Sequence, residues 1–168
     1  ILGDGAGFVY SKLGLSHHSC EDISFLRPLK NMNIFAPADK FELEYAFNSS
    51  IKQRGPSYIR LGKEDRPMVS DSVPQQGLSF IDADSKVLVI ATGSLSHSGK
   101  NLCEKHGWKF ISLNQISPMP KSVIEEVDKA NQVFVIEEHV EQGGAYSAVL
   151  ENVMSLKGKI TPSVKSIS

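Results

Sequence analysis

Cysteine, long apolar segments and an excess of charge of one sign are all scarce in this sequence, and each scarcity excludes a class of protein. Only two cysteines occur in 168 residues, Cys20 and Cys103, and they lack the close spacing of a disulfide framework or a thiolate metal site. The longest apolar runs, such as Val87–Ala91, fall far short of the roughly 20 residues that cross a bilayer. Lysine and arginine number 18 against 19 acidic residues, without the basic stripe of a nucleic-acid binder. We expect a soluble, cytoplasmic globular chain with neither a nucleic-acid nor a membrane partner.

The sequence does contain 40% apolar residues, grouped into short strands that alternate with helices. Strands are expected where brief apolar runs end at Gly or Pro, and helices where apolar residues recur every three or four positions. Asp39 followed by Glu42 predicts a capping box at a helix start. Short strands between helices favour an α/β fold with a parallel sheet covered on both faces. The expected helices are 19–29, 39–51, 94–106, 121–129 and 145–156, and the expected strands are 33–36, 57–61, 86–91, 108–113 and 132–137.

One stretch separates two styles of sequence. Residues 62–85 are polar, contain Pro67, Pro74 and Gly77, and show no sustained periodicity, which is typical of a linker. We therefore predict a first domain over 1–66, a linker over 67–85 and a second domain over 86–168.

The first candidate site is the loop Gly14-Leu15-Ser16-His17-His18-Ser19. Two adjacent imidazoles beside a helix start could serve as neutral hydrogen-bond donors or as a proton shuttle near neutral pH. An ordinary loop histidine is the alternative interpretation. A zinc site is not favoured, because no Cys or His partner lies at ligand spacing.

Two further segments carry polar groups at strand ends. The loop Arg60–Arg66 places cations after a strand, where they could hold a phosphorylated substrate. Glu137-Glu138-His139, followed by Gly143-Gly144, could bind a polar ligand or an anion at a helix start. A solvated loop in the first case, and turn chemistry with a helix cap in the second, remain open alternatives.

Several of these motifs, taken in order, resemble those of the transketolase family. The resemblance covers nearly the whole chain and joins the second half of a pyrimidine-binding domain to a transketolase C-terminal domain. It is shared with deoxyxylulose-phosphate synthase and pyruvate-dehydrogenase β chains, and is closest to split transketolases, whose two halves are separate chains. It implies two α/β domains with three-layer parallel or mixed sheets, the first of them incomplete. The motifs are Gly14–Asp22, Leu26-Arg27, Asn31-Met32, Pro37-Ala38-Asp39 with Glu42, Gly55–Arg60, Val87–Gly93, Val135–His139 and Gly143-Gly144.

The resemblance implies an enzyme of carbohydrate metabolism that uses thiamine diphosphate and magnesium to move a two-carbon ketol unit between sugar phosphates. His17 matches the family histidine near the reacting carbon and is the implied catalytic residue. His18, Arg60 and Lys63 are the implied substrate ligands, with Lys63 at the position of the basic residue that grips the sugar phosphate. Lysine there keeps a cation but loses the planar fork of arginine.

Two departures from the family pattern leave the sugar open. Leu13 stands where transketolases have an aspartate that reads a substrate hydroxyl, and Leu15 replaces the loop proline. A different donor or acceptor is therefore an alternative.

The resemblance also implies parts that are absent from the sequence. The glutamate that activates the cofactor, and the domain that binds its diphosphate and Mg²⁺, have no counterpart in the chain, so no cofactor or metal ligand is predicted in it. Because the chain begins at Ile1 without a methionine, we expect it to be a C-terminal piece, inactive alone. Its expected partners are a cofactor-binding transketolase subunit or domain, a second copy in a homodimer, and a sugar phosphate. The alternative is a non-catalytic module for dimerisation or ligand sensing, built on the segment 137–144.

Overall fold

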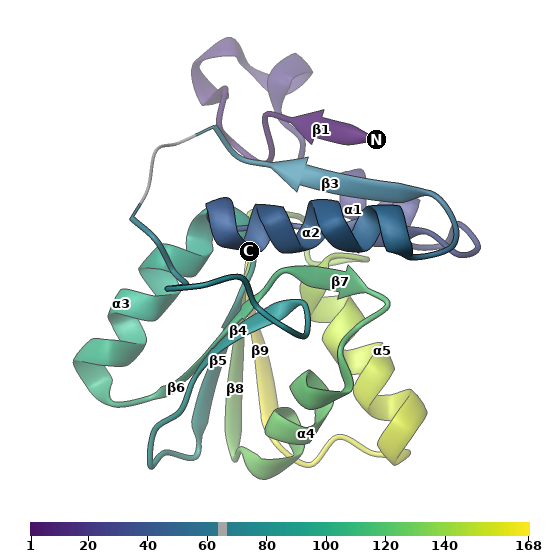
Figure 1. Ribbon diagram of the computed structural model, residues 1–168. Coiled ribbons are helices and arrows are strands. Elements are labelled where there is room, and N and C mark those ends of the chain that lie inside the picture. Colours follow the sequence, from purple (N-terminus) through teal and green to yellow (C-terminus); the bar gives the residue numbers. More distant parts are fainter. Residues whose placement is uncertain (64–66) are drawn as a thin grey trace.

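The computed structural model describes residues 1–63 and 67–168. These residues form two sheets flanked by helices, with the N-terminal sheet stacked above the C-terminal one (Figure 1). Among the described residues, no helix combines the length and apolar content that crossing a membrane requires. The elements in chain order are β1 (Leu2–Asp4), 3₁₀ turns Ser11–Leu13 and Leu15–His17, α1 (Asp22–Leu26), β2 (Asn33–Phe35), α2 (Lys40–Lys52), β3 (Ser57–Leu61), β4 (Leu78–Ile81), β5 (Val87–Ala91), a 3₁₀ turn Gly93–Leu95, α3 (Ser96–His106), β6 (Lys109–Leu113), β7 (Gln115–Ser117), α4 (Lys121–Lys129), β8 (Gln132–Ile136), α5 (Ala145–Lys157) and β9 (Ser163–Ile167).

The N-terminal sheet has the strand order β1-β3-β2-β7. Strands β1 and β2 lie parallel to β3 on its two sides, whereas β7 pairs with β2 in the antiparallel direction. Helix α2 covers this sheet, and its Ala46 packs against Phe35 and Ile59. The carboxyl ends of β1 and β3 therefore lie side by side, which places the segments that follow them at the same edge.

The C-terminal sheet has the order β4-β6-β5-β8-β9. All of its strands run parallel except β4, which pairs antiparallel with β6 at one edge. Helix α3 covers one face, and α4 and α5 cover the other (Figure 1). This confirms the predicted α/β class with a sheet covered on both faces.

The capping box predicted at α2 is present. One carboxylate oxygen of Asp39 accepts the amide hydrogens of Phe41 and Glu42, both at 2.9 Å. Glu42 reaches back and accepts the amide of Ala38, also at 2.9 Å. The start of this helix is therefore set by its own sequence, as its spacing predicted.

Strand pairing crosses the predicted domain limits. Strand β4 lies inside the stretch 67–85 that we interpreted as a linker, and β7, from the predicted second domain, belongs to the N-terminal sheet. Both strands are short, and β4 is only half-buried, so neither has the long apolar run by which an isolated sequence shows a strand. The domain limits 1–66 and 86–168 stay predictions. The stretch between them is not an unstructured linker throughout, because β4 pairs with β6.

Other differences lie at the ends of elements. The start of the chain, where no strand was expected, contains β1, which adds to β3 through main-chain pairing. The edge strand β9 was not expected, and the helix predicted over 19–29 is only the five-residue α1. A single buried apolar cluster joins both sheets, and it includes Ile23, Ile34 and Tyr58 from the first part and Leu88, Ile116 and Val149 from the second.

Candidate functional site

The two adjacent histidines lie on a closed loop between β1 and α1. The amide of Gly7 donates to the carbonyl of Ser19 at 2.9 Å, and the amide of Ser19 donates back to Gly7 at 3.0 Å. Gly7 has φ +62°, a left-handed conformation that favours glycine. This pair of bonds forms the base of the loop 8–18, which we call the histidine loop.

His17 is exposed and His18 is half-buried within the histidine loop. Nδ1 of His17 lies 2.9 Å from the Ser16 hydroxyl, and its Nε2 has no hydrogen-bond partner among the described residues. The ring of His18 meets Phe8 edge to face, with centroids 5.0 Å apart. His17 can thus offer one ring nitrogen to a ligand.

Lys63 follows β3 and reaches the histidine loop through Tyr10. Its ammonium donates to the Tyr10 hydroxyl at 2.6 Å, and this hydrogen bond is the main cause that raises the pKa of Lys63. The Tyr10 ring also meets the His17 ring edge to face, with centroids 6.3 Å apart. The structure therefore brings His17 and Lys63 together around Tyr10, and we call these three residues the Tyr10 cluster, whereas the His18 ring lies against Phe8 on the same loop. Tyr10 was missed because nothing in its local sequence marks an aromatic side chain as a bridge.

Arg60 does not share that surface. It is only 4% exposed, and its Nε donates to both Asp22 oxygens at 2.9 and 3.1 Å. Its Nη2 donates to the carbonyls of Ser19 at 2.6 Å and Glu138 at 3.0 Å. The Tyr58 hydroxyl donates to the same Asp22 carboxylate at 2.7 Å. These contacts engage the guanidinium inside the protein and lend no support to the predicted direct contact with a phosphate. Residues 64–66 of the predicted loop lie outside the described residues.

The carboxylate of Glu137 caps α5. It accepts the amides of Ala145 at 2.6 Å and Tyr146 at 2.9 Å. Burial raises the pKa of Glu137 and outweighs these two hydrogen bonds, which act to lower it. A side chain at Gly144 would collide with this carboxylate, so glycine is required there. Glu137 and Gly144 therefore fit the helix-cap alternative that the sequence left open.

Glu138 and His139 also use their polar atoms inside the protein. Glu138 accepts the amide of Phe8 at 3.2 Å and the hydroxyl of Ser94 at 2.7 Å. Nδ1 of His139 lies 2.7 Å from the Val140 carbonyl, and its Nε2 accepts the amide of Ile23 at 3.2 Å. Burial lowers the pKa of His139 and favours the neutral ring that this pattern requires.

Gly143 has only main-chain groups to offer a ligand, and its carbonyl already accepts a hydrogen bond from Arg27 at 2.9 Å. With Glu137, Glu138 and His139 also engaged, each of the three side chains predicted to bind a ligand here already has an internal partner. The described contacts therefore lend that prediction no support.

The described residues do not fit a complete thiamine-diphosphate site. Their buried carboxylates, Asp22, Glu42 and Glu137, are each held by internal donors and so cannot serve an aminopyrimidine. Within the same residues, no group of three or more His, Cys, Asp or Glu side chains could hold a metal ion. We therefore derive no catalytic step through the cofactor from this chain.

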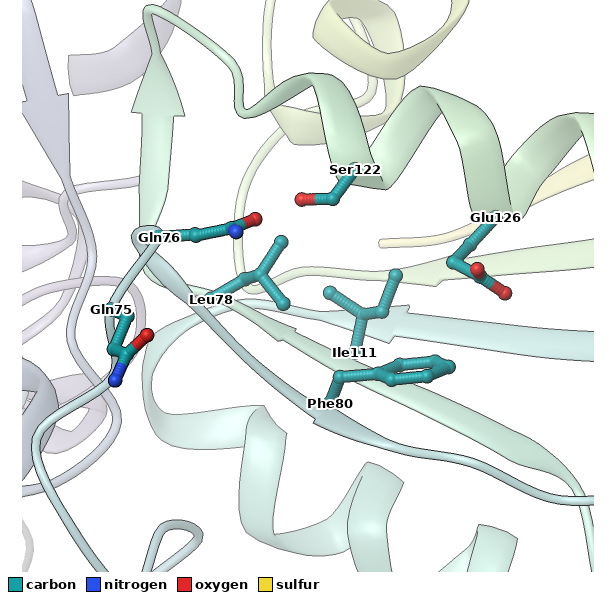
Figure 2. A pocket seen from close by; sticks show the side chains of 7 residues that line it. All are labelled: Gln75, Gln76, Leu78, Phe80, Ile111, Ser122 and Glu126. Atoms are coloured by element: carbon teal, nitrogen blue, oxygen red, sulfur yellow. The ribbon is translucent and has the colours of Figure 1, made fainter.

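A cavity of about 290 Å³ lies beside α4 (Figure 2). Its lining combines Leu78, Phe80 and Ile111 with polar side chains, but the carboxylate of Glu126 is already paired with Lys109 at 3.3 Å. It contains none of the predicted site residues.

The fold agrees with the class of domain that matches by sequence. Residues 1–68 match the family described as "Transketolase, pyrimidine binding domain". A solved structure named "Split gene transketolase, inactive beta4 tetramer" superposes with a TM-score of 0.77 and 26% identity, covering 100% of this chain and 57% of that one.

Curated relatives extend the similarity over both parts of the chain. A 1-deoxy-D-xylulose-5-phosphate synthase from Haemophilus ducreyi is 30% identical over 168 residues, covering 96% of this chain and 27% of the relative. The enzyme of the same name from Actinobacillus pleuropneumoniae serotype 5b is 29% identical over 167 residues, with the same coverage of 96% and 27%. A protein from Methanocaldococcus jannaschii that carries the name of a transketolase C-terminal section is 25% identical, covering 92% of this chain and 52% of that protein.

This chain belongs to the transketolase family and corresponds to a C-terminal part of it. It spans about a quarter of the length of the synthases it matches. The predicted membership and fold class are confirmed, and the activity of a whole protein is a separate question.

Proposed function

We propose that this chain supplies the substrate-facing residues of a transketolase-like, thiamine-diphosphate-dependent transferase that moves a two-carbon ketol unit between sugar phosphates. The observation that carries this proposal is the Tyr10 cluster at the carboxyl ends of the parallel strands β1 and β3. Ligands of open α/β sheets bind at that edge. The family membership supports the same placement.

Each member of the cluster has a role that its chemistry permits. The Nε2 of His17, which has no hydrogen-bond partner among the described residues, hydrogen-bonds a substrate oxygen and transfers a proton to or from it. The ammonium of Lys63 pairs with the sugar phosphate as a compact point charge. Tyr10 holds Lys63 in place, and His18 lines the same loop.

The cofactor and Mg²⁺ come from a partner subunit or domain, since the described residues offer no site for them. The solved neighbour is, by its name, an inactive assembly of β chains, which fits a chain that is inactive alone. We propose that the complete enzyme is a homodimer of such pairs and that it works in the cytoplasm.

Reconstitution with a cofactor-binding partner tests the proposal. Ketol transfer is assayed over a panel of sugar phosphates. Formation of 1-deoxy-D-xylulose 5-phosphate is followed in parallel, because several relatives are named as synthases of this compound. His17→Ala should lower kcat by roughly 10²–10⁴-fold, the usual range for a positioned acid or base. His106→Ala removes another exposed histidine and should have no effect.

Lys63→Ala separates phosphate binding from the rest of the site. A lost charge-assisted hydrogen bond should raise KM for phosphorylated substrates by about 10- to 100-fold. KM for an unphosphorylated sugar should not change. An inactive reconstituted pair, or a fully active His17→Ala enzyme, would overturn the proposal.

An assembly module is the second candidate, and one observation favours it. Leu43, Phe47 and Ile51 recur every four residues along α2, and all three are exposed, Phe47 by 56%. Such an apolar stripe is typical of a surface that another chain covers. A reconstituted pair without activity, in which Phe47→Glu separates the subunits during sedimentation, would favour this candidate over the enzyme.

A further inference from the structure

We propose that Glu138 is a positioning residue, through which the C-terminal part of the chain sets the place of the histidine loop. The inference rests on the proposed function, because a position matters only if His17 meets a substrate. It gives the second half of the chain a specific task at a site whose side chains all come from the first half.

The carboxylate of Glu138 joins three segments that are distant in sequence. One oxygen accepts the amide of Phe8, the first residue of the histidine loop, at 3.2 Å. The other accepts the hydroxyl of Ser94, which follows β5, at 2.7 Å. Because the Phe8 ring packs edge to face on His18, a displacement of Phe8 also displaces an imidazole.

The far end of the loop is tied to the same short segment. Val140 donates its amide to the Cys20 carbonyl at 2.8 Å. The guanidinium of Arg60 bridges the carbonyls of Ser19 and Glu138 at 2.6 and 3.0 Å. Residues 138–140 therefore hold both ends of the histidine loop.

The tip of the loop has little support of its own, so its orientation depends on the base. Leu13 is 58% exposed and Leu15 is 88% exposed. At the base, the Glu138 carboxyl lies directly against Gly7, where an added Cβ would collide with it. Glycine at position 7 thus leaves room for the glutamate at position 138. The local sequence around either residue gives no sign of this contact.

The amide and hydroxyl partners of Glu138 define a sharp pair of variants. Glu138→Ala removes both acceptors and should release the loop. Glu138→Gln keeps an oxygen for the Phe8 amide and can donate its NH₂ to Ser94, so it should restore the loop. Glu141→Ala changes an exposed glutamate on the same segment and serves as the control.

Amide hydrogen exchange and imidazole NMR signals of the full chain give the first readout, which requires no activity. In Glu138→Ala, the Phe8 amide should exchange about tenfold faster or more, as expected for loss of a hydrogen bond to a charged group, and the His17 and His18 signals should shift. Glu138→Gln and the control should match the wild type. Unchanged exchange and unchanged signals in a folded Glu138→Ala chain would overturn the proposal. If that variant fails to fold, Ser94→Ala removes one tie only, and unchanged His18 signals there would overturn it equally.

Steady-state kinetics of the reconstituted enzyme give the second readout. Glu138→Ala should lower kcat about tenfold while KM for the sugar phosphate, set by Lys63, stays the same, and Glu138→Gln should recover kcat. A loop that is released by Glu138→Ala in an enzyme without any transferase activity would refute the proposed function and leave the positioning role supported. An equal loss in both Glu138 variants would refute the positioning role instead.

Discussion

Replacing Glu42 by glutamine should remove a large part of the pH dependence of stability near neutrality. Glu42 is fully buried in α2, where its oxygens accept the Ala38 amide at 2.9 Å and the Ser79 hydroxyl at 2.8 Å. Burial is the main cause that raises its pKa to about 7, and the nearby charge of Asp39 acts in the same direction. Glutamine has nearly the same shape and can make both hydrogen bonds without a charge.

The sign and size of the effect follow from proton linkage. Because the pKa of an unperturbed glutamate is 4.5 and that of Glu42 in the folded chain is about 7, the folded state binds more protons between these values. The stability that the protonated Glu42 contributes is fully present below pH 4.5 and is lost as the pH rises through about 7. At about 1.4 kcal/mol per pH unit, the loss is roughly 3 kcal/mol. A change of this size moves the Tm of a chain this long by about 6–12 °C.

Urea unfolding followed by circular dichroism from pH 5 to 8 measures the effect. Wild type should lose roughly 2–3 kcal/mol relative to Glu42→Gln across this range, since part of the loss precedes pH 5. Burial also lowers the pKa of His139 and raises that of Glu137, but both groups are present in either protein, so the difference isolates Glu42. Glu44→Gln, at an exposed position of the same helix, should follow the wild type. Parallel curves for wild type and Glu42→Gln would refute the reasoning.

Three further predictions concern buried and half-buried groups. Arg60→Ala should lower the free energy of unfolding by about 3–5 kcal/mol, because it leaves the Asp22 carboxylate buried without its cation; denaturant titration measures this, and adding Asp22→Asn should recover part of it. Asp39→Ala should cost about 1 kcal/mol for the lost helix cap and more for two further amides that its second oxygen accepts, and a loss under 0.5 kcal/mol in the same titration would contradict the role. Burial raises the pKa of Cys20, and that of Cys103 to about 11, so both thiols should resist a thiol reagent at pH 8 until urea unfolds the chain; rapid reaction of the native protein would contradict their burial.

Elements that depend on local chemistry could be predicted from the sequence. The capping box of α2, the helix Lys121–Lys129 and the buried strand β5 each carry their own signal, because a helix start or an apolar strand is specified by residues close in the chain. The family also followed from the order of short motifs. These motifs named His17, His18, Arg60 and Lys63 as residues of one site, and the structure groups His17 and Lys63 around Tyr10.

The edges of the sheets were not predictable in the same way. Strand β4 was interpreted as part of a linker, and β7 was not expected at all. An edge strand is stabilised by main-chain bonds to a partner, and that partner is chosen by the fold.

The sequence by itself determined the class of fold, the family and the surface histidines, since each rests on residue types at short spacing. Only the tertiary structure decided what the charged side chains do. Arg60 follows the pattern of a phosphate ligand, yet it is buried against Asp22, and Glu138 reaches Phe8 across 130 positions of sequence. Whether a charge faces solvent, a ligand or a buried partner depends on the segments that folding places beside it, and no local pattern contains that information.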